Sequence, residues 1–352
     1  MKGLWKYLSP FAPDQSGATA VLCELEGLIV IIDAGGCAGN ICGFDEPRWF
    51  DKRSAIFSAG LRDMDAILGR DDRLIAKIGD VCKKIEGKFV ALVGTPVPAV
   101  IGTDYKALKR MIEVRTGIPV LALDTDGTHY YDEGCRKAWL ELFRTFAGKT
   151  YGMEAGHYGV IGATPFDVDM EGLRFDGPGT WHCYGMGAGI DEIKAAGAVM
   201  KNLVVAPGGL KAARYLAARF GTPYEAGYPL GQIRGYDSFM DQMKGLLAPD
   251  RGIRKILIVH QQVLAHSLRE ELRKQTDAMI RLASWFEMDK ELMEPWDIPL
   301  LDEDQWIRLA AEGGYDMIIG DQLLGEAIPD YKGRFIILNH FAISGKPLRF
   351  II

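Results

Sequence analysis

The sequence lacks any apolar run that approaches the roughly 20 residues required by a membrane helix. Its first residues, MKGLWKYLSPFAPD, have no apolar core of the kind found in a signal peptide. Basic residues are not in excess, because 41 Lys and Arg face 47 Asp and Glu and leave a net charge of −6. A chain without a basic field has no general means of holding nucleic acid. We therefore predict a protein that binds neither membranes nor nucleic acid.

Cysteine and nucleotide-binding motifs are also scarce. The chain of 352 residues has six cysteines without paired spacing, which fits a reducing compartment better than a disulfide framework. We therefore expect a cytoplasmic protein. No G-x-x-x-x-G-K-[ST] sequence occurs, so the chain is not expected to hydrolyse ATP itself.

Most of the sequence consists of short apolar runs, each followed by a loop and a helical pattern. Such alternation is typical of α/β folds with mostly parallel sheets. We predict three Rossmann-like doubly wound units with clefts between them, over residues 1–152, 153–250 and 251–352. The expected strands are Leu28–Ile32, Phe89–Val93, Val120–Leu123, Gly159–Ile161, Asn202–Val205, 255–260, 316–320 and 335–340.

The segment after the first strand carries Cys37 and Cys42. Loops at the carboxyl ends of strands are where α/β folds place ligands, and two thiols five residues apart can converge on one metal or cluster. The neighbouring Gly35, Gly36, Gly39 and Gly43 would let the backbone approach such a cofactor and donate N–H groups to it. The alternatives are a zinc site, a redox-active disulfide, or two small buried hydrophobic residues.

Several weak motifs occur together in an order that resembles the nitrogenase component 1 superfamily, whose members hold metal clusters in nitrogenases and in tetrapyrrole-reducing relatives. The DAGGCAGN stretch resembles the family's HGPxGC segment, with Cys37 in the place of its cysteine. The other stretches that carry the resemblance are SPFAPDQSGATAVLCELEGL at 9–28, VGTPVPAVIGTDYKAL at 93–108, GIPVLALDTDGTH at 117–129 and AARFGTPYEAGYPLG at 217–231.

The sequence also departs from the family pattern. Related subunits carry three cluster cysteines in the first domain, but two of these positions fall near Pro13 and Pro96, so only Cys37 remains. The cysteine that holds the cofactor of true nitrogenases would lie near Ala206–Gly208, where there is none. His340 lies near the family's cofactor histidine. We therefore do not expect reduction of dinitrogen.

The resemblance implies a cluster-bearing component that receives electrons from a separate ATP-dependent iron–sulfur reductase and reduces a small molecule or tetrapyrrole. A [4Fe–4S] cluster normally needs four thiolates. A homodimer, or a dimer with a closely similar second subunit, would supply them from Cys37 and Cys42 of each chain at a twofold axis. Arg48 could offset the negative charge of such a cluster.

Three histidines are candidate proton donors to the substrate. His260 and His340 both end strands of the third unit and are expected to face one cleft, opposite His182. Asp126 would join them if the chain is an enzyme. Alternatively, each histidine caps a strand, and the protein carries a cluster, cofactor or small ligand without turnover. A metal-free metabolite-binding module is a third possibility.

Overall fold

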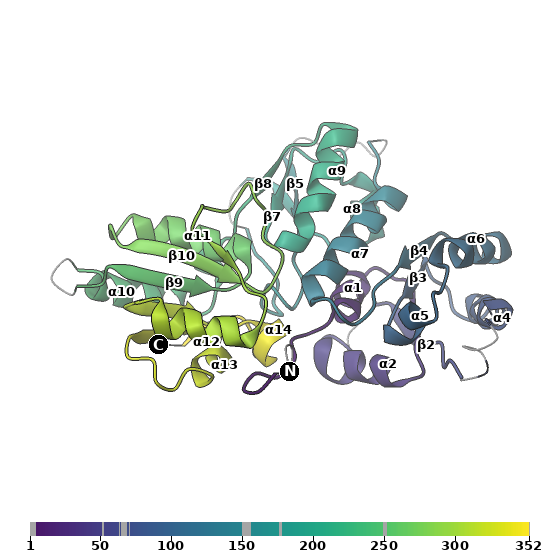
Figure 1. The fold of residues 1–352 in the computed structure, drawn as a ribbon. Coiled ribbons are helices and arrows are strands. Elements are labelled where there is room, and N and C mark those ends of the chain that lie inside the picture. The colour runs from purple at the N-terminus through teal and green to yellow at the C-terminus, as the bar shows by residue number, and fades with distance from the viewer. Residues whose placement is uncertain are drawn as a thin grey trace.

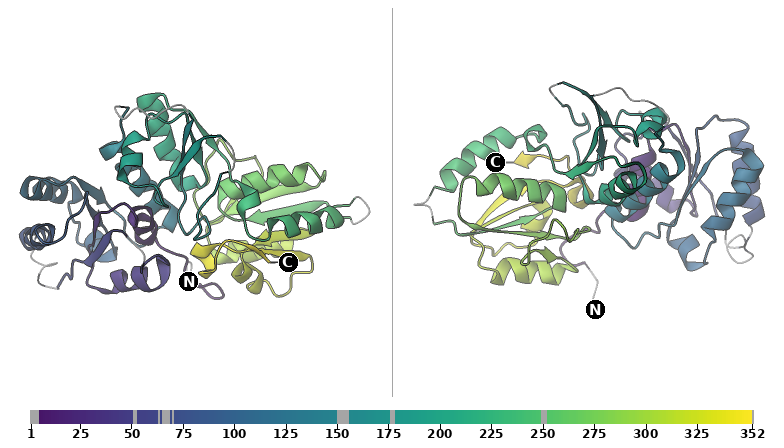
Figure 2. Two further views of the ribbon diagram at one scale, coloured as in Figure 1. Left: turned by 180° about the vertical axis from the view of Figure 1, so that it is seen from behind. Right: turned by 90° about the horizontal axis from the view of Figure 1, so that it is seen from above.

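Three sheets and the helices that cover them make up the protein, seen in a computed structural model as three lobes (Figures 1 and 2). The strands are parallel except for one pair, so the α/β class with mostly parallel sheets is confirmed. The described residues are 5–50, 53–62, 64, 69, 71–149, 156–175, 178–248 and 252–351. The expected unit boundaries at 152 and 250 lie outside them and stay predictions.

The first sheet has the strand order β2-β1-β3-β4, and every neighbouring pair is parallel. Apolar, β-branched residues explain its central strands, because each residue of β1 and β3 is buried. The strands are β1 (Leu28–Ile31), β2 (Ala55–Ser58), β3 (Val90–Val93) and β4 (Val120–Leu123), and the helices beside them are α4 (Asp71–Cys82), α5 (Pro96–Val100) and α6 (Tyr105–Thr116).

The second sheet has the order β6-β5-β7-β8 and is also parallel throughout. Its strands are β5 (His157–Ile161), β6 (Thr180–Cys183), β7 (Lys201–Val204) and β8 (Tyr224–Ala226). The helices that follow them are α8 (Ile190–Ala195), α9 (Leu210–Phe220) and α10 (Tyr236–Leu246), with the short 3₁₀ turns η2 (Pro207–Gly209) and η3 (Leu230–Gln232).

The third sheet has the order β11-β10-β9-β12-β13-β14, and only its last strand is antiparallel. Its strands are β9 (Lys255–Val259), β10 (Met279–Ser284), β11 (Ile298–Pro299), β12 (Met317–Gly320), β13 (Arg334–Leu338) and β14 (Phe350–Ile351). Its helices are α11 (Gln262–Arg273), α12 (Glu303–Glu312), α13 (Gln322–Glu326) and α14 (Phe341–Ser344). None of the helices in the described part of the chain has both the length and the apolar character needed to cross a bilayer.

Two helices, α1 (Asp14–Leu22) and α7 (Tyr131–Phe146), lie at the centre of the molecule where the three lobes meet (Figure 1). All residues of α1 are buried. Two glycines allow the helices to approach closely, because a Cβ on Gly17 would lie 1.9 Å from the Tyr131 carbonyl oxygen and one on Gly134 would lie 1.7 Å from that of Asp14. One continuous apolar core therefore reaches from the first sheet through α7 to the second and third sheets.

The segment expected to be a loop after β1 is instead helical. It forms the short helix α2 (Gly36–Asn40) and the π-helical turn η1 (Ile41–Asp45). Gly35 starts α2 with a φ of 119°, and the Asp33 carboxylate accepts a 2.8 Å hydrogen bond from the Ala38 N–H. At the far end the Ser16 hydroxyl donates to Asp45 at 2.6 Å. These side-chain contacts hold a short helix that the glycine-rich sequence does not predict.

Candidate functional site

The predicted cluster segment lies at the carboxyl edge of the first sheet, beside the N-terminus of α1. Asp33 follows β1, and Thr95 follows β3 and donates to the Ile32 carbonyl at 2.8 Å. Thr125 follows β4 and donates to the Gly94 carbonyl at 2.7 Å. These hydrogen bonds fix the three strand ends relative to one another, so that α2 and η1 start from a rigid edge.

Cys37 and Cys42 lie on α2 and η1, and both are half-buried. Burial raises the pKa of the Cys37 thiol, and the neighbouring Asp33 carboxylate raises it further, while the Thr95 hydroxyl opposes both. The thiol is therefore protonated at neutral pH, and a metal must displace this proton when it binds.

The surface around the two cysteines is open and partly apolar. A Cβ added at Gly35, Gly36, Gly39 or Gly43 would meet no atom within 4 Å. The Phe44 side chain is 77% exposed. Within the described residues, no group of three or more Cys, His, Asp or Glu ligands includes Cys37 or Cys42. One chain therefore offers a cluster two thiols, and the residues fit a four-thiolate cluster only if a second chain supplies the others.

Arg48 follows η1 and is paired within its own chain. Its guanidinium is buried and donates to the Glu46 and Glu24 carboxylates and to the carbonyls of Ala20 and Gly185. Its charge is therefore neutralised locally, and it ties the segment after η1 to α1 and to the second lobe. The expected role of Arg48 as a counter-charge for a cluster stays a prediction, and the structure shows that Glu24 and Glu46 already pair with it.

His260 and His340 meet where the three lobes join. They follow β9 and β13, and their ring centroids are 4.5 Å apart. His340 Nδ1 accepts from the Ala342 N–H at 3.2 Å, so its proton lies on Nε2, 3.2 Å from the Tyr131 hydroxyl. Tyr131 in turn donates to Asp167 at 2.7 Å. All four residues are at most 2% exposed, so this network is sealed from solvent.

Burial shifts the pKa values of the groups in this network. It raises the pKa of Asp167 to about 8, against the hydrogen bonds from Tyr131 and Thr164. It raises the pKa of Asp132 to about 7, although that carboxylate accepts from the Glu287 N–H at 2.5 Å. It lowers the pKa of His260 to about 4. The network therefore holds neutral histidines beside acids that ionise only near or above neutral pH.

Several polar atoms at this junction have no partner. His260 Nε2 lies 3.3 Å from the Asn339 carbonyl oxygen and donates its proton to it. The other ring nitrogen, Nδ1, therefore has a lone pair, and this atom accepts no hydrogen bond. The Asn339 amide is fully buried, with neither Oδ1 nor Nδ2 paired. Unpaired buried polar groups cost roughly 1–3 kcal/mol each, so the junction has polar atoms available for a water or ligand.

The other expected site residues lie elsewhere. His182 is on β6, where its Nε2 lies 2.8 Å from His157 Nδ1 on β5, and the two rings are nearly parallel at 11°. Asp126 accepts from Thr128 and interacts with His129. Of the four titratable groups expected in one cleft, the structure thus brings together His260 and His340. Tyr131 and Asp167 belong to the same network. No sequence signal predicts their contact, because it links two different lobes.

A cavity of about 520 Å³ lies away from both groups. It is formed by α12 and the segment after α13, with Tyr7, Tyr315 and Tyr331 among its lining residues, and it includes neither Cys37 nor His340. Size alone therefore does not identify the site in this protein.

Comparison with known proteins identifies the family. The model of the nitrogenase component 1 type oxidoreductase matches residues 14–292, which is most of the chain. This chain belongs to that family. It is 27% identical to the nitrogenase iron-molybdenum cofactor biosynthesis protein NifE of Klebsiella pneumoniae, over 77% of this chain, and it spans 66% of the length of that relative.

Solved structures of family members share the fold. A structure of nitrogenase Cp1 at pH 6.5 superposes with a TM-score of 0.69 over 98% of this chain and 88% of that chain, at 11% identity. A structure of nitrogenase Cp1 at pH 5 gives 0.66 over 95% and 84%, at 14% identity. The resemblance to nitrogenase component 1 proteins and the three-unit fold are thereby confirmed.

The positions that the family resemblance assigns to cluster ligands lie around one point of the sheet edge. Pro13 precedes Asp14, whose carboxylate accepts from the Gly127 N–H, and a Cβ on Gly127 would lie 2.8 Å from the Pro96 ring. Cys37 interacts with Thr95, next to Pro96. In this nitrogenase component 1 family member, prolines therefore stand where the resemblance expects two of the three cysteines.

Proposed function

We propose that this protein is an iron–sulfur oxidoreductase component in which Cys37 and Cys42 of two chains hold one [4Fe–4S] cluster across a twofold axis. The observation that carries the proposal is the placement of the two thiols, half-buried on one short helical segment at an open, glycine-rich surface. Because an isologous interface repeats each residue, a segment near the axis contributes four thiolates in total.

Exposed apolar side chains in the first lobe favour a second copy of this chain, or a closely similar chain, as the partner. Phe50, which follows Phe44 in the chain, is 93% exposed. Val100 at the end of α5 is 86% exposed, and the next residue, Ile101, is 44% exposed. The Thr95–Cys37 interaction places the start of α5 against α2. Large exposed apolar side chains can mark interaction sites, and we propose that a dimer through the first lobe covers these.

The electrons would come from a separate ATP-dependent iron–sulfur reductase, since the sequence has no Walker motif. When bound, the cluster would supply one-electron transfer. The substrate would be a small molecule or a tetrapyrrole rather than dinitrogen, because no cysteine occurs at Ala206–Gly208. His260 and His340 are neutral in the closed junction, so they would become proton donors only after opening lets them take up protons, and His182 would act from the second lobe. Their burial requires the junction to open before a substrate can reach His260 or His340.

A carrier without turnover is the second candidate. The relative NifE is named for the biosynthesis of a cofactor, and the sealed junction around His340 suits a protein that takes up a ligand and releases it through a change of conformation. Adding a tetrapyrrole to the dithionite-reduced protein separates the two candidates. An oxidoreductase reoxidises its cluster as the substrate is consumed, whereas a carrier shows binding with the cluster still reduced.

The decisive experiment measures iron and acid-labile sulfide per chain after strictly anaerobic purification. We expect about two irons per chain in a dimer, because one [4Fe–4S] cluster is shared by two chains. Cys37→Ala and Cys42→Ala should each lose this iron. Cys82→Ala is the matched control, because Cys82 is also half-buried but lies on α4. Wild-type protein without iron, or iron retained in both variants, would rule out the shared cluster.

A further inference from the structure

A second group of metal-ligand side chains lies where α1 meets the segment between β4 and α7. It consists of Asp14 at the start of α1 and of Asp126 and His129 in that segment. One ligand atom from each residue lies within 4.8 Å of the others, and His129 Nδ1 is 3.0 Å from Asp126 Oδ1. No other such group of three occurs among the described residues.

Gln15 provides an independent observation at the same place. Its side chain is 6% exposed, and its Oε1 is buried without a hydrogen-bond partner. This oxygen faces the segment that holds the group, because a Cβ on Gly127 would lie 3.2 Å from it while the Gly127 N–H donates to Asp14 at 2.8 Å. An orphaned carbonyl oxygen that faces this segment lacks a donor or positively charged group, and a cation would satisfy it.

The internal hydrogen bonds shape the segment but leave capacity for a ligand. The two Asp14 oxygens accept one N–H each, from Asp126 and Gly127, and every carboxylate oxygen has a second lone pair. Asp126 Oδ1 accepts from the Thr128 N–H at 2.8 Å and from the Thr128 hydroxyl at 2.7 Å, and the lone pairs of its second oxygen, Oδ2, are the ones available to a ligand. The His129 side chain is 57% exposed, and a bound ion would therefore be reachable from solvent.

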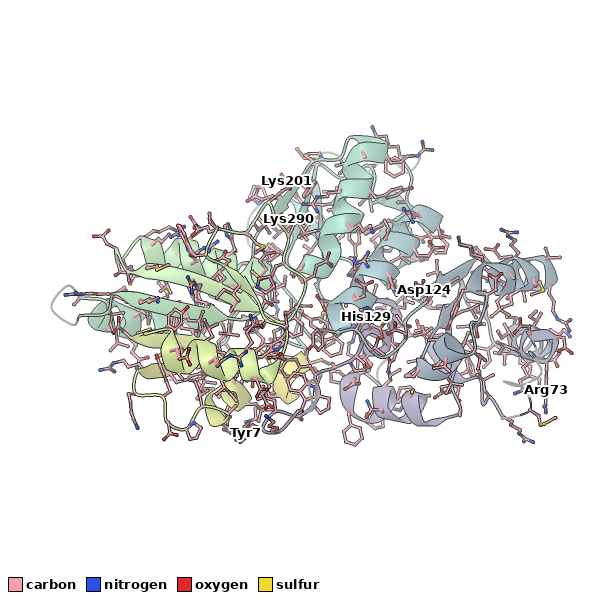
Figure 3. All side chains as sticks on the ribbon, in the orientation of Figure 1. Tyr7, Arg73, Asp124, His129, Lys201 and Lys290 are labelled. Atoms are coloured by element: carbon pink, nitrogen blue, oxygen red, sulfur yellow. The ribbon has the colours of Figure 1, made fainter. Side chains whose placement is uncertain are left out.

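We propose that Asp14, Asp126, His129 and the Gln15 carbonyl form a binding site for a divalent first-row transition metal such as Mn²⁺, Fe²⁺ or Zn²⁺. Three oxygen ligands and one imidazole nitrogen favour these ions over Mg²⁺ and Ca²⁺, which prefer oxygen alone. Figure 3 shows His129 beside α1, close to Asp124. Asp104 and Asp124 line the adjoining cavity of about 350 Å³ and add negative charge at the entrance, which Lys106 and Lys137 only partly offset.

The site goes beyond the proposed cluster and does not depend on it. Its ligands are oxygen and nitrogen atoms rather than thiolates, so removal of Cys37 should leave it intact. The two metal centres are thus separable by experiment, and loss of one says nothing against the other.

The test is a Mn²⁺ titration of the full chain after chelator treatment and dialysis, in which the six-line EPR signal reports free Mn²⁺. We expect one saturable site per chain in the wild type and in Cys37→Ala. His129→Ala and Asp126→Asn should weaken binding by more than about tenfold, as for the loss of a group that holds the metal. Asp80→Asn, which changes an exposed acid on α4 outside both the group and the cavity lining, should change the affinity by less than about twofold.

The exposed position of His129 makes its variant the decisive one, because its replacement should not unfold the chain. A matching circular dichroism melting curve for His129→Ala confirms this. The proposal is overturned if the wild type shows no saturable site for Mn²⁺ or Zn²⁺, or if His129→Ala binds as tightly as the wild type.

Discussion

The cluster segment of the first lobe and the histidine network at the junction of the lobes differ in how complete they are within one chain. Cys37 and Cys42 are half-buried, the exposed Phe44 follows them closely in sequence, and one chain supplies two of the four thiolates that a cluster requires. His260 and His340 are sealed and bonded to residues of their own chain. Under the proposed function, the first region depends on a partner molecule, whereas the second depends on an opening motion. Experiments that disturb one region at a time can test this contrast.

Association through the cluster segment should show the largest effect. Val100→Asp would place a charge in the proposed interface, and we expect the dimer mass to fall to that of the monomer, with loss of the shared iron. Val114→Asp is the control, because Val114 is 89% exposed and Val100 is 86% exposed, but Val114 lies on α6. Light scattering coupled to size exclusion gives the masses. A monomeric wild type, or equal effects of both variants, would refute the interface.

Replacing a buried aromatic residue at the junction should reduce the free energy of unfolding much more than replacing an exposed aromatic residue near the cluster segment. Phe286 is 3% exposed and stacks on His340 with centroids 4.8 Å apart, so we expect Phe286→Ala to cost about 3–5 kcal/mol of unfolding free energy. Phe50 is 93% exposed, and Phe50→Ala should cost less than about 0.5 kcal/mol in the monomer. Chemical denaturation in the Val100→Asp background measures both. Similar costs would show that the junction is not the sealed core that we describe.

A smaller effect is expected in the pH dependence of stability. Burial raises the pKa of Asp167 to about 8 and of Asp132 to about 7, so the folded protein retains protons that the unfolded chain releases near pH 4. Stability should therefore fall as pH rises from about 6.5 to 8, by up to about 1.4 kcal/mol per pH unit for each retained proton. Burial also lowers the pKa values of His260 and His340, so their opposite contribution ends only as pH rises through the unfolded value of about 6.5 and reduces the fall at the lower end of this window.

Asp167→Asn isolates this contribution. The variant should lose less stability than the wild type between pH 6.5 and 8, because it keeps a neutral side chain throughout this range. Asp124→Asn, which changes an exposed carboxylate, should follow the wild-type curve. Melting temperatures across the pH series provide the measurement, and parallel curves for wild type and Asp167→Asn would contradict the assignment of a retained proton to Asp167.

The sequence predicts those parts of the fold that depend on local apolar patterns. The strand Val120–Leu123 has the expected bounds, because a run of apolar residues is a signal that acts over a few positions. Strand β6, with the sequence TWHC, was not expected, because its residues are neither β-branched throughout nor fully buried. Helix α2 was missed because Asp33 and Asp45 hold it through contacts beyond its own sequence.

The candidate sites show the same limit. His260 and His340 were expected on one edge because both end strands of one sheet, and the structure places their rings side by side. His182 belongs to another sheet, where it pairs with His157. The Tyr131–Asp167 hydrogen bond and the Asp14–Asp126–His129 group join residues far apart in sequence. Their proximity follows from how the lobes and α1 pack, which no local pattern encodes.

The close crossing of α1 and α7 has a consequence for dissecting the protein. Helix α7 precedes residue 152 in the chain, yet it packs on α9 and η2 of the second lobe as well as on α1, and Gly208 lies against Asp132 and Cys135. A fragment that ends near residue 152 would expose the face of α7 that packs on α9 and η2. The second lobe without α7 would likewise expose the apolar residues that contact this helix. Any exchange of lobes between relatives should therefore transfer α1 and α7 together with the second sheet.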